Sequence, residues 1–369
     1  MASRTENPPI HTAAEPVPET APARGPRRKL GSLTIHDVAA LAGVSSVTAS
    51  RYFNDPGRVS EKLRDKLAAV IRDTGYVPSQ VARRLASSQG GLVGAVMQNV
   101  ASPTFAPLVR GMGDTLEQHG LQLLLANSDY SIASEERAIQ AFLGWHPSGL
   151  ILTRGDHSEA SDALLAQLRI PVIEAWEVVE GRPFHQVGFS QREVGHMLTR
   201  HFLEQGVRRI RFALNARMDD TRAARRAEGY AQTMRAAGLV PEVVVSPESD
   251  DILAGTDHAE RLASESAGGR PRAVVFSNDS MAMAALLGAA RLGLAVPDVC
   301  ALAGFGDAPI GAILTPALTT VRTAPDAIGS TAARMLIELL HAPAGQPAGI
   351  RTHRIDCELV VRDSSRITR

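Results

Sequence analysis

The chain is poor in the residues that build metal centres and disulfide frameworks. Its 369 residues include two cysteines, Cys300 and Cys357, and its 11 histidines are scattered along the sequence. Two isolated cysteines cannot make a disulfide framework or a metal cluster, so we expect both to be small core residues in a reducing cytosol. We predict no metal site and no cofactor.

Long hydrophobic runs are also missing. The longest, GLQLLLA and MAMAALLGAA, fall far short of a membrane span, which takes about 20 apolar residues. The N-terminal stretch MASRTENPPIHTAAEPVPET has no apolar core and therefore does not resemble a secretory signal. We expect a cytoplasmic protein with no membrane partner.

No catalytic motif is complete. The stretches RGMGDTLEQHG and GFGD contain GxG, but neither forms the strand–GxGxxG–helix fingerprint of a dinucleotide site. The sequence also has no P-loop, no GxSxG motif and no His/Cys cluster at metal spacing. These absences argue against an enzyme.

The charge is balanced overall but uneven along the chain. Lys and Arg together number 39, as do Asp and Glu, so the formal net charge is zero. Residues 1–90 contain 13 basic and 8 acidic residues, a balance of +5, and the remainder therefore carries −5. A basic N-terminal region suggests that this part of the chain approaches a polyanion.

Three helices are predicted between residues 31 and 78. They follow a Pro-, Ala- and Thr-rich tail over residues 1–30, which we expect to be disordered. The helices are TIHDVAALAG, SVTASRYFN and VSEKLRDKLAAVIRDTGYVP. Ser60 is suited to cap the third helix and Gly75 to end it.

A glycine separates the first two helices. Gly43 can take the left-handed conformation that a sharp turn requires, and Ala39 and Ala42 are small enough for the helices to pack closely. This is the design of a helix-turn-helix, whose second helix enters the major groove of DNA. On that helix, Arg51 can donate two hydrogen bonds to guanine. An ordinary helical hairpin is the alternative that these residues alone leave open.

From Leu92 onward, short apolar runs alternate with helical segments. The runs include GLVGAVM, LQLLLAN, GLILT, IPVIEAW, RIRFAL and AVVFS. Apolar strands joined by helices indicate parallel sheets that are covered on both faces. Ligands on such sheets bind at the carboxyl ends of the strands. The predicted fold class is therefore α followed by α/β.

The stretch TIHDVAALAGVSSVTASRYFNDPGRVSEKLRDKLAAVIRDTGYVPSQVARRLAS closely resembles the headpiece of the LacI/GalR family of bacterial repressors. The shared elements are T-I-x-D-V-A-x-x-A-G-V-S, T-x-S-R-x-x-N, V-S-x-x-x-R-x-K, G-Y-x-P and A-R-x-L. The resemblance implies a DNA-binding headpiece over 31–78 and a hinge helix with its linker over 79–90. It also implies an effector-binding and dimerisation core over 91–369, with two α/β subdomains of the periplasmic-binding-protein type. The chain is expected to cross between these subdomains near 190, 319–325 and 360.

The same resemblance assigns the DNA contacts. Ser46, Val47 and Arg51 are expected to read bases. Leu85 is expected to insert between base pairs in the minor groove, where an apolar wedge bends the duplex. The other residues expected to contact DNA or support the motif are Thr34, Ser45, Thr48, Ser50, Asn54, Ser60, Tyr76, Ser79, Val81 and Ala82.

In the core, the resemblance implies an effector in the cleft between the subdomains. Many sugar-binding members carry Asp at the position of Gly306, and often Asp-Asn at Ser190-Gln191. We interpret the loss of these acceptors, with arginines retained, as favouring an anionic ligand. The stretches GLILTRGDHS, IPVIEAW, VGFSQ and RRAEGYAQTMRAAGL look most like the gluconate-responsive branch. The expected effector-binding residues are Phe105, Arg154, Arg226, Asn278 and Asp279.

The sequence thus predicts a homodimeric repressor of a sugar-acid operon. It would bind palindromic operator DNA and be released by a small-molecule effector. A neutral sugar as effector, or a purine as co-repressor, stays open within the same class. A sugar-binding protein without a DNA role would need export, against which the headpiece and the missing signal argue. The segment CELVVRDSSRITR has no leucine heptad, so we expect no tetramer-forming extension.

Overall fold

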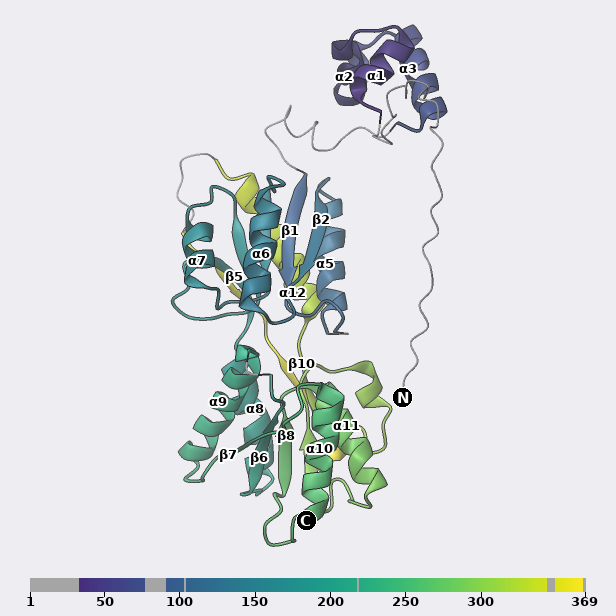
Figure 1. Cartoon of the computed structure of the whole chain (residues 1–369). Coiled ribbons are helices and arrows are strands. Elements are labelled where there is room, and N and C mark those ends of the chain that lie inside the picture. Colours follow the sequence, from purple (N-terminus) through teal and green to yellow (C-terminus); the bar gives the residue numbers. More distant parts are fainter. Residues whose placement is uncertain (1–32, 77–90, 103, 218, 344–348, 368–369) are drawn as a thin grey trace, which may run out of the picture. The chain divides into compact units, whose positions relative to one another are not determined.

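The computed structural model describes residues 33–76, 91–102, 104–217, 219–343 and 349–367 (Figure 1). These residues form two units, a small N-terminal helical unit and a large core. The predicted tail over 1–30 and hinge over 79–90 lie outside the described residues. Among the described helices, none is long and apolar enough to cross a membrane.

The described residues of the N-terminal unit form helices joined by short turns, without a strand, as predicted. It contains α1 (Ile35–Ala42), α2 (Ser46–Asn54), η1 (Pro56–Arg58) and α3 (Glu61–Thr74). Gly43 has a φ of 63° and ends α1, so the left-handed turn predicted between the first two helices is confirmed. Gly75, with a φ of 62°, ends α3 in the same way. A small apolar core joins the helices, formed by Val38, Ala39, Ala42, Ala49, Leu67 and Tyr76.

The first subdomain of the core is a parallel sheet with helices on both faces. The strand order is β11-β5-β4-β3-β1-β2. Its strands are β1 (Leu92–Met97), β2 (Gln122–Asn127), β3 (Gly149–Leu152), β4 (Val172–Glu177), β5 (His185–Phe189) and β11 (Thr352–Arg354). Its helices are α5 (Ala106–Glu117), α6 (Ile132–Leu143), α7 (Glu159–Ala166) and α12 (Pro325–Leu340). The strands β1, β3 and β4 are buried along their whole length, which explains their unbroken apolar sequences.

The second subdomain repeats this plan with a smaller sheet. The strand order is β7-β6-β8-β9, and all pairs are parallel. Its strands are β6 (Ile210–Leu214), β7 (Glu242–Val245), β8 (Ala273–Phe276) and β9 (Ala301–Ala303). Its helices are α8 (Gln191–Glu204), α9 (Thr221–Ala236), α10 (Asp251–Ser264), α11 (Asp279–Arg291) and the short η2 (Pro309–Ala312). The predicted fold class, α followed by α/β, is confirmed.

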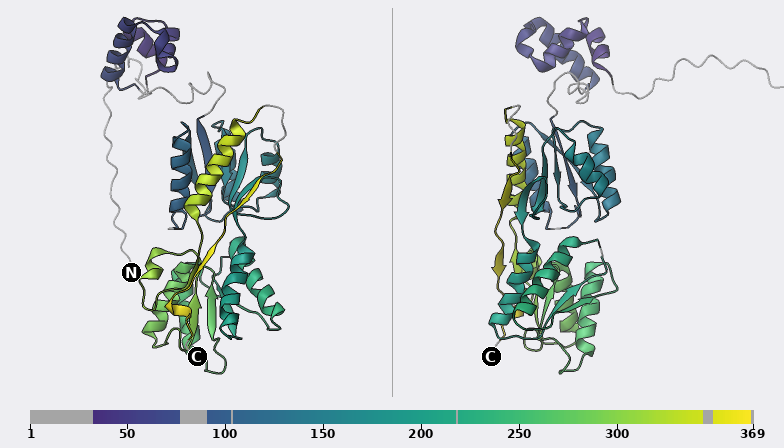
Figure 2. Two further views of the ribbon diagram at one scale, coloured as in Figure 1. Left: turned by 180° about the vertical axis from the view of Figure 1, so that it is seen from behind. Right: turned by 90° about the vertical axis from the view of Figure 1, so that its left-hand side faces the viewer.

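Connecting segments join the two subdomains, which lie one above the other in both views of Figure 2. The chain leaves the first sheet after β5 and enters α8. It returns through β10 (Thr320–Arg322) to α12, and passes back from β11 into β12 (Glu358–Val360) and η3 (Asp363–Ser365). The strands β10 and β12 pair antiparallel between the subdomains. These segments hold the carboxyl ends of the two sheets on either side of one cavity.

Candidate functional site

The second helix of the N-terminal unit presents a polar outer face. Ser45 caps α2, since its side chain accepts a hydrogen bond from the backbone N–H of Thr48 at 3.1 Å. Ala49 is fully buried on the inner face, whereas Val47 is 58% exposed. The Arg51 side chain is exposed, and its guanidinium forms no ion pair with another described residue. Val47 and Arg51 therefore face solvent on α2, the second helix of the helix-turn-helix. This is the helix that reads the major groove of DNA in such motifs.

The other expected DNA residues occupy several kinds of position. Thr34 caps α1 in a reciprocal pair with Asp37. Ser60 occupies the N-cap position of α3, as predicted, but its side chain makes no capping hydrogen bond. Tyr76 is buried, with its ring centroid 6.0 Å from that of Phe53, so it supports the motif from within. Ser46, Thr48 and Ser50 are partly buried on α2, and Asn54 ends it. Ser79, Val81, Ala82 and Leu85 lie outside the described residues.

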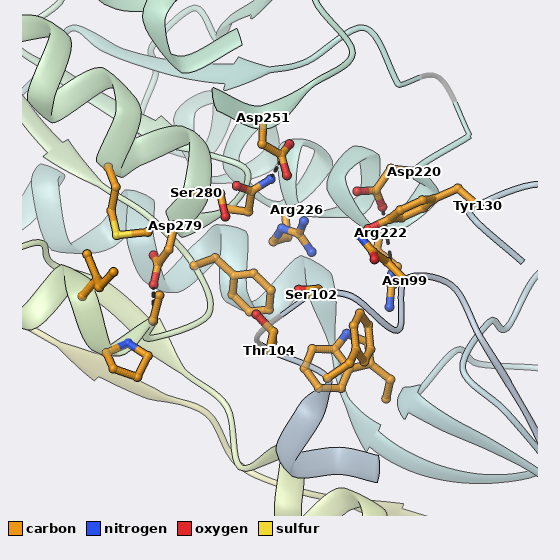
Figure 3. Close-up of a pocket in the computed structure, with 18 residues that line it drawn as sticks. Asn99, Ser102, Thr104, Tyr130, Asp220, Arg222, Arg226, Asp251, Asp279 and Ser280 are labelled. Carbon is orange, nitrogen blue, oxygen red and sulfur yellow. Dashed lines mark hydrogen bonds and ion pairs between the residues drawn. The ribbon is translucent and has the colours of Figure 1, made fainter. Parts of the chain in front are cut away.

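The core contains a cavity of about 360 Å³ between the two sheets (Figure 3). Its walls come from the carboxyl ends of strands in both subdomains, the place where open α/β sheets bind ligands. The lining residues are Asn99, Ser102, Thr104, Phe105, Tyr130, Trp176, Asp220, Arg222, Arg226, Asp251, Asn278, Asp279, Ser280, Met283, Phe305, Ala308, Pro309 and Ile310. Of the expected effector residues, Phe105, Arg226, Asn278 and Asp279 therefore meet at one cavity.

Aromatic rings form an apolar wall of the cavity. The rings of Phe105 and Trp176 lie 4.7 Å apart, and Trp176 also packs edge-on against Phe189. Trp176 has a φ of 88° and Tyr130 a φ of 63°, the left-handed region that side chains other than glycine rarely adopt. Such conformations cost on the order of 1–3 kcal/mol and cluster at functional sites. The strained backbone at Trp176 and Tyr130, two lining residues, therefore marks this cavity as a candidate functional site.

Arg226 lies on α9, which is held very close to α8. A Cβ at Gly195 of α8 would lie 2.0 Å from the backbone oxygen of Arg226, so only glycine fits there. The Arg226 side chain donates from Nη1 to Oε1 of Gln191 at 2.5 Å, and its guanidinium lies 4.4 Å from the ring centroid of Phe305. Burial lowers the pKa of this guanidinium below its usual value, although the nearby Asp220 carboxylate opposes the shift. Its Nε atom has no hydrogen-bond partner among the described residues.

Carboxylates line the second subdomain's side of the cavity. Asp251 accepts hydrogen bonds from Asn215 at 2.7 Å and from Asn278 at 3.0 Å. Asp279 accepts from the Thr320 hydroxyl and from the backbone N–H of Ala308, both at 2.7 Å. Burial raises the pKa of the Asp279 carboxyl to about 6, although these two hydrogen bonds oppose the rise. Asp251 and Asp279 thus supply carboxylate acceptors to the cavity even though position 306 is a glycine. The expectation that acceptors are missing is therefore wrong, and the argument for an anionic ligand rests on the arginines alone.

Arg154 does not line the cavity, and its expected contact with an effector is not supported. Its side chain is 2% exposed. Its Nη1 donates to the backbone oxygen of Tyr130 at 2.7 Å and its Nε to that of Asp156 at 2.9 Å. These hydrogen bonds connect the loop after β2 with the loop after β3. Arg154 thus supports the backbone that carries Tyr130.

An ion pair joins the two subdomains beside the cavity. Nη1 of Arg225, on α9, lies 2.6 Å from Oε2 of Glu177, at the end of β4. Both side chains are largely buried. Burial raises the pKa of the Glu177 carboxyl, and Arg225 and Arg222 oppose that rise. Because the two partners belong to different subdomains, this ion pair would break if the subdomains moved apart and opened the cavity.

Sequence reasoning missed Arg222, Asp220, Tyr130 and Asp251 as lining residues. Arg222 could have been found, since it precedes Arg226 by four residues and so lies on the same face of a helix. Tyr130 lies in the loop after β2 and Asp251 begins α10, and neither carries a motif that marks it. Among the described residues, no group of three or more His, Cys, Asp or Glu side chains could hold a metal ion.

A helix-turn-helix unit on the same chain as a two-sheet core with a polar cavity defines a ligand-responsive DNA-binding protein. Residues 34–79 match the bacterial regulatory proteins of the lacI family, and residues 199–365 match a periplasmic binding protein-like domain. The HTH-type transcriptional regulator GntR of Pseudomonas aeruginosa is 33% identical over 92% of this chain and 97% of its own length. The regulator IdnR of Escherichia coli strain K12 is 30% identical over 83% of this chain and 91% of its own length.

Solved structures agree with these relatives. A LacI-family transcriptional regulator from Silicibacter pomeroyi covers 90% of this chain and 100% of its own, with a TM-score of 0.81 at 28% identity. The regulator GntR from Chromobacterium violaceum covers 74% of this chain and 99% of its own, with a TM-score of 0.66 at 30% identity. The chain belongs to the lacI family. It is a DNA-binding transcriptional repressor and not an enzyme.

Proposed function

We propose that this repressor controls a sugar-acid utilisation operon and that a gluconate-like sugar acid, bound in the cavity, is its effector. The carrying observation is a pair of buried arginine donors without partners. Nη1 of Arg222 and Nε of Arg226 form no hydrogen bond with any described residue. A buried polar group without a partner is costly, and a carboxylate offers the planar, charge-assisted acceptor that a guanidinium fits best.

The remainder of the cavity suits a polyhydroxylated chain. Asp251, Asn278, Ser280, Asn99 and Ser102 supply acceptors and donors for hydroxyl groups, and the aromatic wall covers apolar carbon–hydrogen faces. Gluconate combines one carboxylate with five hydroxyl groups. The resemblance to the gluconate-responsive branch, and the similarity to relatives named GntR and IdnR, support the same ligand class.

The cavity position also suggests how a ligand acts on DNA binding. Because both subdomains line the cavity, a ligand that contacts both favours one relative arrangement of the sheets. We propose that this arrangement changes the spacing of the two hinges in a homodimer and releases a palindromic operator. The protein would act in the bacterial cytoplasm, and on the nucleoid while it is bound to DNA.

A ligand panel tests the proposal. The full-length protein is titrated by calorimetry with gluconate, glucose, ribose and a purine, and operator release is followed by fluorescence anisotropy. We expect gluconate to bind, to release the operator and to stabilise the protein by about 2.7 kcal/mol at 100 times its Kd. Tight binding of a neutral sugar or a purine, with no binding of sugar acids, would show that the effector assignment is wrong.

A further inference from the structure

Arg222 is a nearly buried cation whose Nη1 forms no hydrogen bond with any described residue. Its residue is 5% exposed and lines the cavity near the start of α9. Its guanidinium carbon lies 5.3 Å from the ring centroid of Phe105 and 5.8 Å from that of Tyr130. The nearest carboxylate, Asp220, is 3.9 Å from Nε and already caps α9 through the backbone N–H of Ala223. Two aromatic faces and one distant carboxylate do not satisfy a guanidinium that has lost its water.

Arg226 is in a different situation, although it faces the same cavity. One of its terminal nitrogens already donates to Gln191, and the ring of Phe305 covers a face of its guanidinium. Fewer of its donors are therefore open to a ligand. In the view of Figure 3, Arg226 lies between Arg222 and the Asp251 carboxylate. This position suits contact with the middle of a chain-like ligand.

The two ends of the cavity thus differ: one contains the Arg222 guanidinium, with Asp220 as its nearest carboxylate, and the other contains Asp251. Arg222, Asp220, Tyr130 and Asn99 gather at one end in Figure 3, and Asp251 and Ser280 at the other. We propose that Arg222 receives the effector's carboxylate and makes the site select a sugar acid over a neutral polyol of equal length. Arg226 and the Asp251 end then hold the hydroxylated chain. The inference rests on the proposed function and adds the residue that decides between charged and neutral ligands.

The experiment compares two ligands that differ at one carbon. Gluconate carries a carboxylate at C1, whereas glucitol carries a neutral hydroxymethyl group there and keeps the other hydroxyls. Both Kd values are measured on full-length protein by calorimetry, with glucitol measured by competition against gluconate if it binds weakly. The variants are Arg222→Gln, Arg226→Gln and the surface control Arg192→Gln. The Arg192 side chain, on α8, is half-exposed and pairs with the half-exposed Glu228 of α9. Thermal unfolding checks that each variant is folded.

The measured quantity is the preference for gluconate over glucitol. We expect a preference of about 100-fold in the wild type, the size of effect found when one partner of a buried charged pair is removed. Arg222→Gln should reduce the preference for gluconate over glucitol to about threefold or less. Arg226→Gln should weaken the binding of both ligands but keep most of the preference. Arg192→Gln should change neither Kd. A folded Arg222→Lys variant should recover part of the preference.

The outcomes separate this inference from the proposed function. If wild-type protein binds no sugar acid, the proposed function fails. If it binds gluconate and Arg222→Gln keeps the full preference, the role of Arg222 is wrong and the proposed function stands. Loss of the preference in Arg226→Gln instead would assign the carboxylate to Arg226.

Discussion

A buried histidine in the first subdomain should make the stability of the core depend on pH. His157 follows β3, and its side chain is fully buried between two carboxylates. Its Nδ1 lies 3.0 Å from Glu135 and its Nε2 3.4 Å from Glu174. Arg182 in turn lies 2.7 Å from both Glu174 and Asp162. Burial disfavours the imidazolium, but the hydrogen bonds and charges of the two glutamates outweigh burial and raise the pKa of His157 to about 9.

The size and sign of the effect follow from this pKa. The unfolded chain binds the proton with a pKa of 6.5, so the folded state at about 9 gains about 3 kcal/mol from the charged histidine. Because the folded pKa is the higher one, this stabilisation is complete below pH 6.5 and is lost as the pH rises through 9. His157→Gln, which cannot be charged, should lower the unfolding free energy by about 3 kcal/mol at pH 6.5 and by much less at pH 9.5.

Urea unfolding followed by tryptophan fluorescence can measure this difference. Both tryptophans of the chain, Trp145 and Trp176, lie in the core, so the signal reports on that unit. His201→Gln is the matched control, since burial lowers the pKa of His201, the opposite direction to the shift at His157. If the difference in unfolding free energy between wild type and His157→Gln stayed constant from pH 6.5 to 9.5, a charged His157 would be refuted.

Three further predictions concern DNA binding and assembly. Arg51→Ala should cost about 1–3 kcal/mol of operator affinity while leaving weak, salt-sensitive binding to scrambled DNA; unchanged discrimination between the two DNAs by anisotropy would contradict a reading role. Leu85→Ala should leave folding and effector binding intact but reduce DNA bending and operator affinity, because the apolar wedge is removed; a bend angle equal to that of wild type argues against the wedge. Light scattering should give twice the 39.2 kDa chain mass, and a tetramer at low micromolar concentration would be inconsistent with a dimer.

The fold could be predicted from the sequence because its signals are local. The turn at Gly43 and the end of α3 at Gly75 each depend on a few neighbouring residues, and the structure has both. The alternation of apolar strands and helices likewise indicated parallel sheets. For Ser60, the helix start was predicted correctly, but the expected side-chain bond is not made.

The make-up of the cavity was decided by tertiary structure. Phe105, Tyr130 and Arg222 are far apart in the sequence, yet their side chains meet because strands from two sheets end at one place. Arg154 ends a strand on the same side and was expected to bind the effector, but packing turns it toward the backbone of the neighbouring loop. Periodicity and capping residues specify a helix or strand within a few positions. Which polar side chains lose their water and face a common cavity depends on how distant elements pack, and no short stretch of sequence carries that information.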